Sequence, residues 1–522
     1  MPDSPLPAAR ATARARRRRM IFNNDGCDCF TRPGAPGTTA ADLIEARTAP
    51  LADSFVDTIF YNTNRSGVGN FSHRTKVGRY FTRQDGRYAT NLCPALAAAG
   101  TDPLAVMVDW CRRQDVEIFW SLRMNDTHDG WGTPGDFSPD QYYGISEIKR
   151  QHPEWLLGGA GRVPKFGLWS ALNYELEPVR DFMFRLIEEV CLNYDVDGVE
   201  CDFMRHPTFF PATADGKDCG DRERGFMTGL LRRVRKMMDD VGAKRGRPLL
   251  LATRTPDSLA AAAGIGLDVE AWMGEGLIDL LAVSDYYRFA PWAESVAAGR
   301  KHDVPVYPCL AESRIKLADG KREPLRNTLE SMRGRALNAW QAGAAGLYMF
   351  NLFDPHSAFW REGGDPHMLE QRDRIYLASV RSVGGAPWRI PGAHRHRSIP
   401  LLAPGPGGVQ IPVRLETVDV PIDVGGSLAA AREIELRMRV ANLAEPGGVA
   451  ARWNGRWLEP GRLEGGLLRW QLDPAEVKPQ GNQAGLVLTS PAGPVWEDLQ
   501  VWVAVEGTIA AMERSLTDLY PE

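Results

Sequence analysis

Short apolar runs alternate with longer stretches of helical periodicity from Met20 to Asn351. Eight of these runs are rich in β-branched and aromatic residues and have the length of buried strands. They are Met20–Asn24, Val56–Asn62, Val116–Arg123, a run within Tyr194–Pro207, Pro248–Arg254, Ile278–Asp285, Val304–Glu312 and Gly346–Asn351. The helical periodicity predicts helices at 102–113, 176–193, 222–241, 267–276, 291–301 and 325–343.

The alternation of strands and helices predicts a parallel sheet in an α/β fold. Eight strands over about 350 residues favour a closed (β/α)8 TIM barrel. A doubly wound open sheet is the structural alternative, but it requires a glycine-rich phosphate turn after the first strand. The segment 23–28, Asn-Asn-Asp-Gly-Cys-Asp, lacks that pattern. We therefore predict a barrel over residues 20–383.

The pattern changes after the barrel. Residues 384–398 are predicted to be a linker, in which His394 and His396 are expected to be exposed basic positions rather than metal ligands. Beyond it, apolar and polar residues alternate with period two and no helix intervenes, which predicts a smaller antiparallel β-sandwich over 399–522. Its strands are expected at 409–415, 433–440, 449–453, 467–472, 484–489 and 499–505, followed by a short helix or tail.

The N-terminus is basic, with Arg14 and Arg16 to Arg19 in an Ala/Pro-rich segment. A targeting signal would need an apolar stretch after these arginines, and the chain passes directly to Ile21-Phe-Asn-Asn. Residues 1–19 are therefore expected to be a disordered arm, or an upstream extension with Met20 as the true start. On this start site a cytoplasmic protein is expected, and no run is long enough to span a membrane.

Composition excludes several classes of function. The net charge of −4 among 522 residues gives no basis for nucleic-acid binding. The eight cysteines are scattered without a Cys-x-x-Cys pair, which argues against a zinc site or a disulfide framework. Asp126-Thr-His-Asp129 is interpreted as a capped polar loop, and we expect no metal or cofactor. The oligomeric state cannot be predicted.

The stretch Tyr194–Pro207 (Tyr-Asp-Val-Asp-Gly-Val-Glu-Cys-Asp-Phe-Met-Arg-His-Pro) combines a strand with polar chemistry. Glu200 and Asp202 are two residues apart and so leave the strand on one face. Two neighbouring carboxylates repel, so at least one needs a cationic or hydrogen-bonding partner or keeps its proton. Either an ion pair closing a strand or half of an active site fits this pattern.

Polar residues end nearly every predicted strand, and barrel enzymes carry their chemistry at these ends. Aromatic residues lie nearby and can stack on sugar rings while amide and charged groups bind hydroxyls. Carbohydrate is therefore the predicted partner. The candidate binding residues are Asn23, Asp25, Asn62, Trp120, Arg123, Asn125, Asp126, Arg205, Arg254, Trp272, Tyr286 and Asn351.

Glycoside cleavage requires one ionised and one protonated carboxyl group. Asp202 is the candidate for the ionised group. Asp285, which follows an apolar strand and precedes two tyrosines, ranks first as the acid. Glu312 ranks second because Arg314 would keep it ionised, and Glu200 lies deeper and could orient Asp202.

Three segments resemble the family-10-like glycosyl hydrolases of environmental bacteria. They are the 194–207 stretch quoted above, the segment 172–182 (Leu-Asn-Tyr-Glu-Leu-Glu-Pro-Val-Arg-Asp-Phe), and the region of Trp272 and Ser284-Asp-Tyr-Tyr287. The resemblance covers about residues 20–380. It implies a (β/α)8 fold, a catalytic role for Asp202 and a glycoside hydrolase that cleaves a poly- or oligosaccharide. A non-catalytic carbohydrate-binding barrel, or a polysaccharide lyase that uses Tyr286 with Arg123, remains as an alternative.

Overall fold

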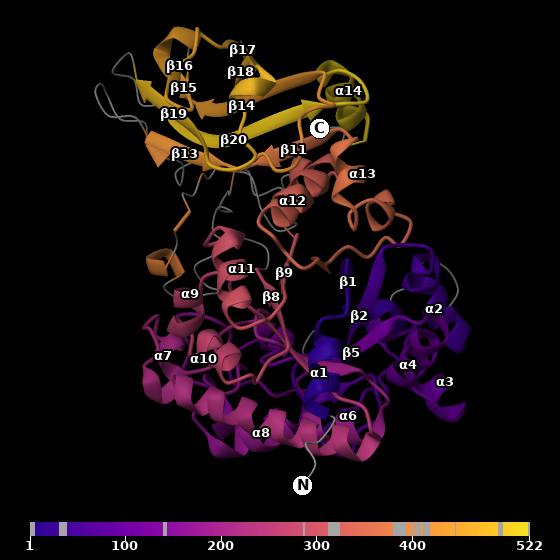
Figure 1. The fold of residues 1–522 in the computed structure, drawn as a ribbon. Helices are drawn as coiled ribbons and strands as arrows, with labels where there is room; N and C mark the ends of the chain where they lie inside the picture. Colours follow the sequence, from indigo (N-terminus) through magenta and orange to yellow (C-terminus); the bar gives the residue numbers. More distant parts are fainter. Residues whose placement is uncertain are drawn as a thin grey trace.

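Most of the described strands belong to two arrays, one parallel and one antiparallel (Figure 1). This computed structural model describes residues 6–30, 39–138, 144–284, 288–311, 324–378, 393–396, 398–399, 402, 409–410, 418–443, 445–488 and 494–519. The first array is the predicted α/β barrel, and the second forms the C-terminal domain.

The barrel contains eight parallel strands in the order β10-β1-β2-β5-β6-β7-β8-β9. They are β1 (Met20–Asn24), β2 (Val56–Asn62), β5 (Glu117–Arg123), β6 (Gly198–Asp202), β7 (Leu250–Thr255), β8 (Leu280–Val283), β9 (Val306–Pro308) and β10 (Leu347–Phe350). Cys309 forms a parallel bridge with Tyr348, which brings β9 next to β10 and nearly closes the barrel. All eight strands lie where the apolar runs predict them.

Helices surround this barrel in the expected alternation. They are α2 (Ala40–Arg47), α3 (Cys93–Ala98), α4 (Pro103–Gln114), α5 (Glu147–Gln151), α6 (Glu177–Asn193), α7 (Pro211–Ala214), α8 (Asp221–Arg245), α9 (Leu259–Gly264), α10 (Val269–Gly274), α11 (Trp292–Lys301), α12 (Leu329–Gln341) and α13 (Pro366–Glu370). Helix α4 illustrates the local causes. Asp102 accepts a hydrogen bond from Ala105 N at 3.0 Å, and Pro103 occupies the first turn, where its missing N–H costs nothing.

The C-terminal domain packs two antiparallel sheets face to face, as predicted. One sheet contains β11 (Arg374–Leu377), β12 (Val409–Gln410), β14 (Glu433–Ala441), β17 (Arg462–Glu464), β18 (Leu467–Gln471) and β20 (Val495–Ala504). The other contains β13 (Val418–Ile422), β15 (Val449–Trp453), β16 (Arg456–Trp457) and β19 (Asn482–Leu488). Helix α14 (Ile509–Leu519) follows and covers part of the first sheet.

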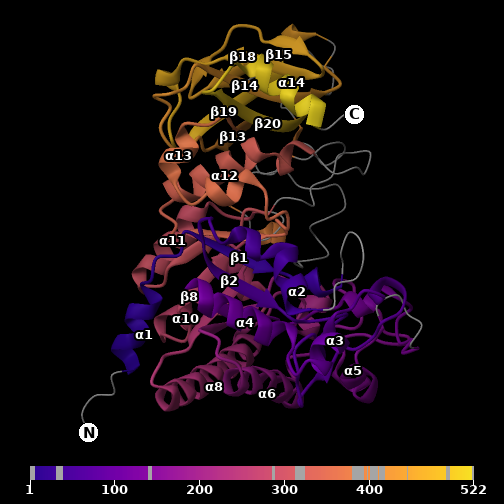
Figure 2. The same cartoon turned by 90° about the vertical axis from the view of Figure 1, so that its right-hand side faces the viewer.

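The boundary between the domains differs from the predicted one. Strand β11, expected within the barrel domain, pairs with β20 and belongs to the sandwich. Helix α12 of the barrel lies against it, between the two domains in both views (Figures 1 and 2). Asn338 on α12 donates to Asp423 O at 3.1 Å and accepts from Gly425 N at 2.8 Å. The predicted linker 384–398 falls mostly outside the described residues.

The N-terminal segment is helical from Leu6 to Arg14 (α1), which corrects the expectation of a disordered arm for its described part. Arg10 donates to Asp279 at 2.7 Å, and Ala13 packs on the apolar interior of the barrel. Fully buried Arg18 donates to both oxygens of Glu117, at 2.6 and 2.7 Å. The segment therefore covers the end of the barrel where the strands begin. None of the helices in the described ranges is long and apolar enough to cross a membrane.

We expect Arg18→Met to lower the free energy of unfolding of the barrel by about 3–5 kcal/mol, because it leaves the buried Glu117 carboxylate without its cation. Urea unfolding measures this change. The matched control is Arg16→Met, which removes a half-exposed arginine whose ion pair spans 4.0 Å and should cost less than about 0.5 kcal/mol. Equal losses in the two variants would contradict a specific role for the buried pair.

Candidate active site

The inward-facing residues of the barrel change from apolar to polar along the strands. The strand period of two places every second side chain inside, and one inward cluster contains Ile21, Phe60, Phe119, Leu250 and Tyr307. Further along the strands the same inward parity places Asn23, Ser121, Glu200, Asp202 and Arg254 in the barrel. The carboxyl ends of the strands therefore carry a polar, largely buried site.

Asp202 ends β6 and is 1% exposed. One carboxylate oxygen accepts from the N–H of Met204 at 2.9 Å, and the other accepts from Arg254 at 3.4 Å. Strand register places Arg123 on β5 and Arg254 on β7 opposite Asp202, one on each side. The negative charge of Asp202 thus lies between two arginine-bearing strands.

Glu200 lies one inward position deeper and is fully buried. Ser121 and Tyr348 donate to its two oxygens at 2.5 and 2.7 Å, and Asn23 donates at 3.3 Å. Burial raises the pKa of the Glu200 carboxyl to about 7, and the charge of Asp202 adds to the rise. Glu200, beneath Asp202, therefore keeps its proton to a higher pH than an ordinary carboxyl group does.

Arg254 is fully buried between this carboxylate and an aromatic wall. Its guanidinium carbon lies 4.0 Å from the ring centroid of Phe350 and 5.5 Å from that of Tyr348. A guanidinium over ring faces gains cation–π attraction, and the gain is larger for a buried pair than for an exposed one. Arg254 is thereby held in place beside Asp202.

A second polar cluster follows β5 and β6. Asp126 accepts from Arg123 at 3.0 Å and lies 2.5 Å from His128 Nδ1, while Arg205 lies 2.6 Å from His128 Nε2. Burial opposes ionisation of Asp126, but His128 and Arg123 bring its carboxyl pKa well below the usual range. Burial lowers the pKa of His128 to about 4, so this ring is neutral near neutral pH.

The ligand atoms of Asp126, His128 and His206 lie within 4.8 Å of one another, close enough for a metal ion. A cation here would have to displace the contacts of Arg123 and Arg205 with the same carboxylate and ring. Both guanidinium groups would also repel it. We therefore interpret the cluster as a hydrogen-bonded network at the barrel mouth.

Several described non-glycine residues have left-handed backbone, and some of them follow barrel strands. His206 (φ 60°), Ser284 (φ 78°) and Asn351 (φ 64°) follow β6, β8 and β10, and Ser66 (φ 57°) follows β2. Such conformations cost free energy and cluster at functional sites. Their occurrence after β6, β8 and β10 agrees with a functional mouth at this end of the barrel.

The other predicted binding residues have different surroundings. Asn62 donates to Asn64 at 3.0 Å and Ser121 O at 2.9 Å, and Asp25 pairs with Arg47 at 2.6 Å. Asn125 uses its amide to hold Leu172 and Thr208 of the neighbouring loops. It is fully buried and therefore a loop-positioning residue.

Two predicted sugar-stacking residues have packing roles instead. Trp120 faces away from the barrel axis, is fully buried and donates to Thr63 at 2.7 Å. Trp272 on α10 is also fully buried, packs on Phe203 and donates to Thr228 at 2.9 Å. Both rings lie in the layer between strands and helices, so neither belongs to the candidate site.

Three predicted residues, Asp285, Tyr286 and Glu312, lie outside the described residues. The fold also brings to the site groups that the sequence pattern does not single out. Tyr348 and Ser121 donate hydrogen bonds to Glu200. The alternation of inward and outward side chains on β10 and β5 could have placed both residues inside the barrel. Asp257 follows β7, accepts from Ser284 at 3.0 Å, and has a pKa raised to about 6 by burial.

No protein-family model matches this chain, and no curated protein matches it. It is similar to alpha-L-fucosidase isoenzyme 2 from Paenibacillus thiaminolyticus (14% identity, 68% of this chain and 48% of that one, TM-score 0.39). It is also similar to the PgaB (BpsB) glycoside hydrolase domain from Bordetella bronchiseptica (10% identity, 66% of this chain and 98% of that one, TM-score 0.38). A third similar structure is the GH36 alpha-galactosidase AgaA from Geobacillus stearothermophilus (11% identity, 94% of this chain and 56% of that one, TM-score 0.39).

The chain thus spans about half the length of the fucosidase and of the galactosidase. These neighbours are glycoside hydrolases, but similarities this remote carry no argument about activity. The resemblance to family-10-like glycosyl hydrolases stays a prediction.

Glu200 is expected to make stability depend on pH. Its folded-state pKa of about 7 lies above the ordinary 4.5, so proton binding favours the folded state. This contribution is complete below about pH 4.5 and is lost as the pH rises through about 7. We expect the melting temperature of the wild type to fall relative to that of Glu200→Gln between about pH 5 and pH 8. The control, Glu459→Gln at an exposed position, should show no such trend, and a constant difference for Glu200→Gln would contradict the assignment.

Proposed function

We propose that the chain is a glycoside hydrolase whose reaction centre includes Asp202. The observation that carries the proposal is the pairing of Asp202 with Arg254 at the carboxyl end of β6, directly above the proton-holding Glu200. Barrel enzymes use carboxyl groups at these strand ends. A buried carboxylate with a fixed cation is suited to act as nucleophile or base.

The acid in this proposal is Asp285, with Glu312 as the second candidate. They follow the strands β8 and β9 in the chain, and carboxyl ends of parallel strands gather at one end of a barrel. Glu200 is less suited to meet a substrate because Ser121, Tyr348 and Asn23 already occupy both of its oxygens. Its proposed role is to position Asp202 and to hold a proton beneath it.

The substrate-binding groups in this proposal come from the mouth. Arg123, Arg205 and Asn351 lie at or beyond the carboxyl ends of β5, β6 and β10. Together they offer the donors that recognise sugar hydroxyls or acidic substituents. The left-handed backbone of Asn351 directs this residue out of the strand conformation at the mouth.

The test is Asp202→Asn, which is nearly isosteric and removes the charge. We expect at least about a hundredfold loss of reducing-sugar release on a glycan that the wild type cleaves. The control is Asp53→Asn, at an exposed position, which should keep full activity. Thermal melting of both variants separates lost chemistry from lost folding.

Activity that survives in Asp202→Asn would contradict the assigned centre. Glycan binding by the wild type without any cleavage across neutral and acidic substrates would favour the non-catalytic carbohydrate-binding barrel.

A further inference from the structure

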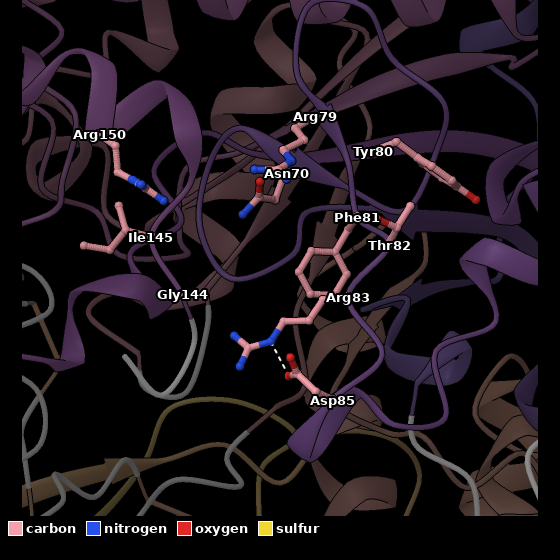
Figure 3. Close-up of a pocket in the computed structure, with 10 residues that line it drawn as sticks. All are labelled: Asn70, Arg79, Tyr80, Phe81, Thr82, Arg83, Asp85, Gly144, Ile145 and Arg150. Carbon is pink, nitrogen blue, oxygen red and sulfur yellow. Dashed lines mark hydrogen bonds and ion pairs between the residues drawn. The ribbon is translucent and has the colours of Figure 1, made fainter. Parts of the chain in front are cut away.

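A cavity of about 420 Å³ lies in the loops beside the barrel mouth (Figure 3). We name it the arginine cavity. Its described lining residues are Asn70, Arg79, Tyr80, Phe81, Thr82, Arg83, Asp85, Gly144, Ile145 and Arg150. Its volume is in the range of small-molecule binding sites.

The arginine cavity is at the same end of the barrel as Asp202. One wall, with β3 (Asn70–Phe71) and β4 (Arg79–Tyr80), belongs to the segment after the carboxyl end of β2. The other wall, with Ile145 and Arg150, belongs to the segment after the carboxyl end of β5. Both segments are therefore βα connections, which carry substrate contacts in barrel enzymes.

Positive charge predominates in the arginine cavity. Arg79 and Arg150 share one carboxylate oxygen of Glu147, each at the long distance of 3.8 Å. Arg83 pairs with Asp85. Figure 3 shows the guanidinium groups of Arg83 and Arg150 reaching toward the space between the two walls. Three guanidinium groups thus face two carboxylates, which leaves an excess of one positive charge.

Asn70 adds an unused hydrogen-bonding group. The residue is only 8% exposed, and its side-chain amide has no hydrogen-bond partner within the described part of the chain. In Figure 3 this amide points into the cavity between Arg150 and Arg83. An amide that reaches into a cationic cavity offers both a donor and an acceptor to a ligand there.

We propose that the arginine cavity binds the acidic group, a carboxylate or a sulfate, of a saccharide. Guanidinium groups bind such anions through charge-assisted, often bidentate hydrogen bonds. The ring of Phe81 supplies apolar surface for a sugar, and Asn70 can bind a hydroxyl. The choice of a saccharide rests on the proposed function. The cavity would make the substrate an acidic glycan.

The test is ligand-observed NMR titration with glucuronate, glucose 6-sulfate, glucose and inorganic sulfate as probes. We expect glucuronate or glucose 6-sulfate to bind at least about tenfold more tightly than glucose, since hydrogen bonds to charged groups are stronger than those between neutral groups. Comparison of the two acidic sugars distinguishes carboxylate from sulfate. Equal binding of glucose and both acidic sugars, or of inorganic sulfate and glucose 6-sulfate, would overturn the proposal.

Variants locate the binding. Arg83→Gln with Arg150→Gln should weaken acidic-sugar binding at least about tenfold, and Asn70→Asp should weaken it by placing a negative charge at nearly the same shape. The control is Arg113→Gln, at the end of α4 that precedes β5. Its arginine side chain is 62% exposed and pairs with Asp109 at 3.5 Å, and the substitution should leave binding unchanged. An effect of Arg113→Gln equal to that of the cavity variants would overturn the assignment.

Binding and hydrolysis separate the two proposals. Acidic-sugar binding that the cavity variants abolish, in a protein that cleaves no glycan, would support the cavity and contradict the glycosidase. Cleavage of neutral glycans that depends on Asp202, without any acidic-sugar binding, would support the glycosidase and overturn the cavity.

Discussion

Every inward-facing charge of the barrel has to find a partner inside it, because an unpaired charge in a water-poor interior is prohibitively costly. At the beginning of the strands this requirement pairs Arg18 with Glu117. At their carboxyl ends it pairs Asp202 with Arg254 and gives Glu200 three neutral donors and a raised pKa. The interior between these levels is apolar. Charged inward-facing side chains therefore occur at the two ends of the barrel, where they have partners. The mouth offers the greater variety of partners.

Most of the fold follows from local pattern. Eight apolar runs and the helices between them predict the barrel, and period-two alternation predicts the sandwich, because burial on one or both faces of a strand selects those patterns. Helix α1 and strand β11 were misassigned for one reason. Arg10 and Arg18 find their partners at Asp279 and Glu117, and β11 pairs with β20, all far along the chain. Pairings between residues so far apart in the sequence cannot be predicted from local sequence pattern.

The candidate site can be predicted from the sequence as far as the sequence shows which side chains of a strand face inward. Glu200, Asp202 and Arg254 could be identified because each sits at or near a strand end and is polar. Parity also separates Trp120 from the site, since it alternates with the inward Phe119 and Ser121. Trp272 needed three-dimensional information. It lies on a helix, and only the packing of α10 on the barrel shows that its ring is buried.

Asp126 connects the barrel mouth to the arginine cavity. Its carboxylate accepts from Arg123, the neighbour of Asp202 in strand register, and its carbonyl oxygen accepts from buried Lys149 at 3.1 Å and from Val68 N at 3.3 Å. Lys149 is the sequence neighbour of Arg150, which lines one cavity wall, and Val68 lies two residues before Asn70, which lines the other. Asp126 thus bonds to Arg123 at the mouth and to the segments that carry both cavity walls. Hydrogen bonds of this kind keep the two places at a constant separation, which a ligand that contacts both would require.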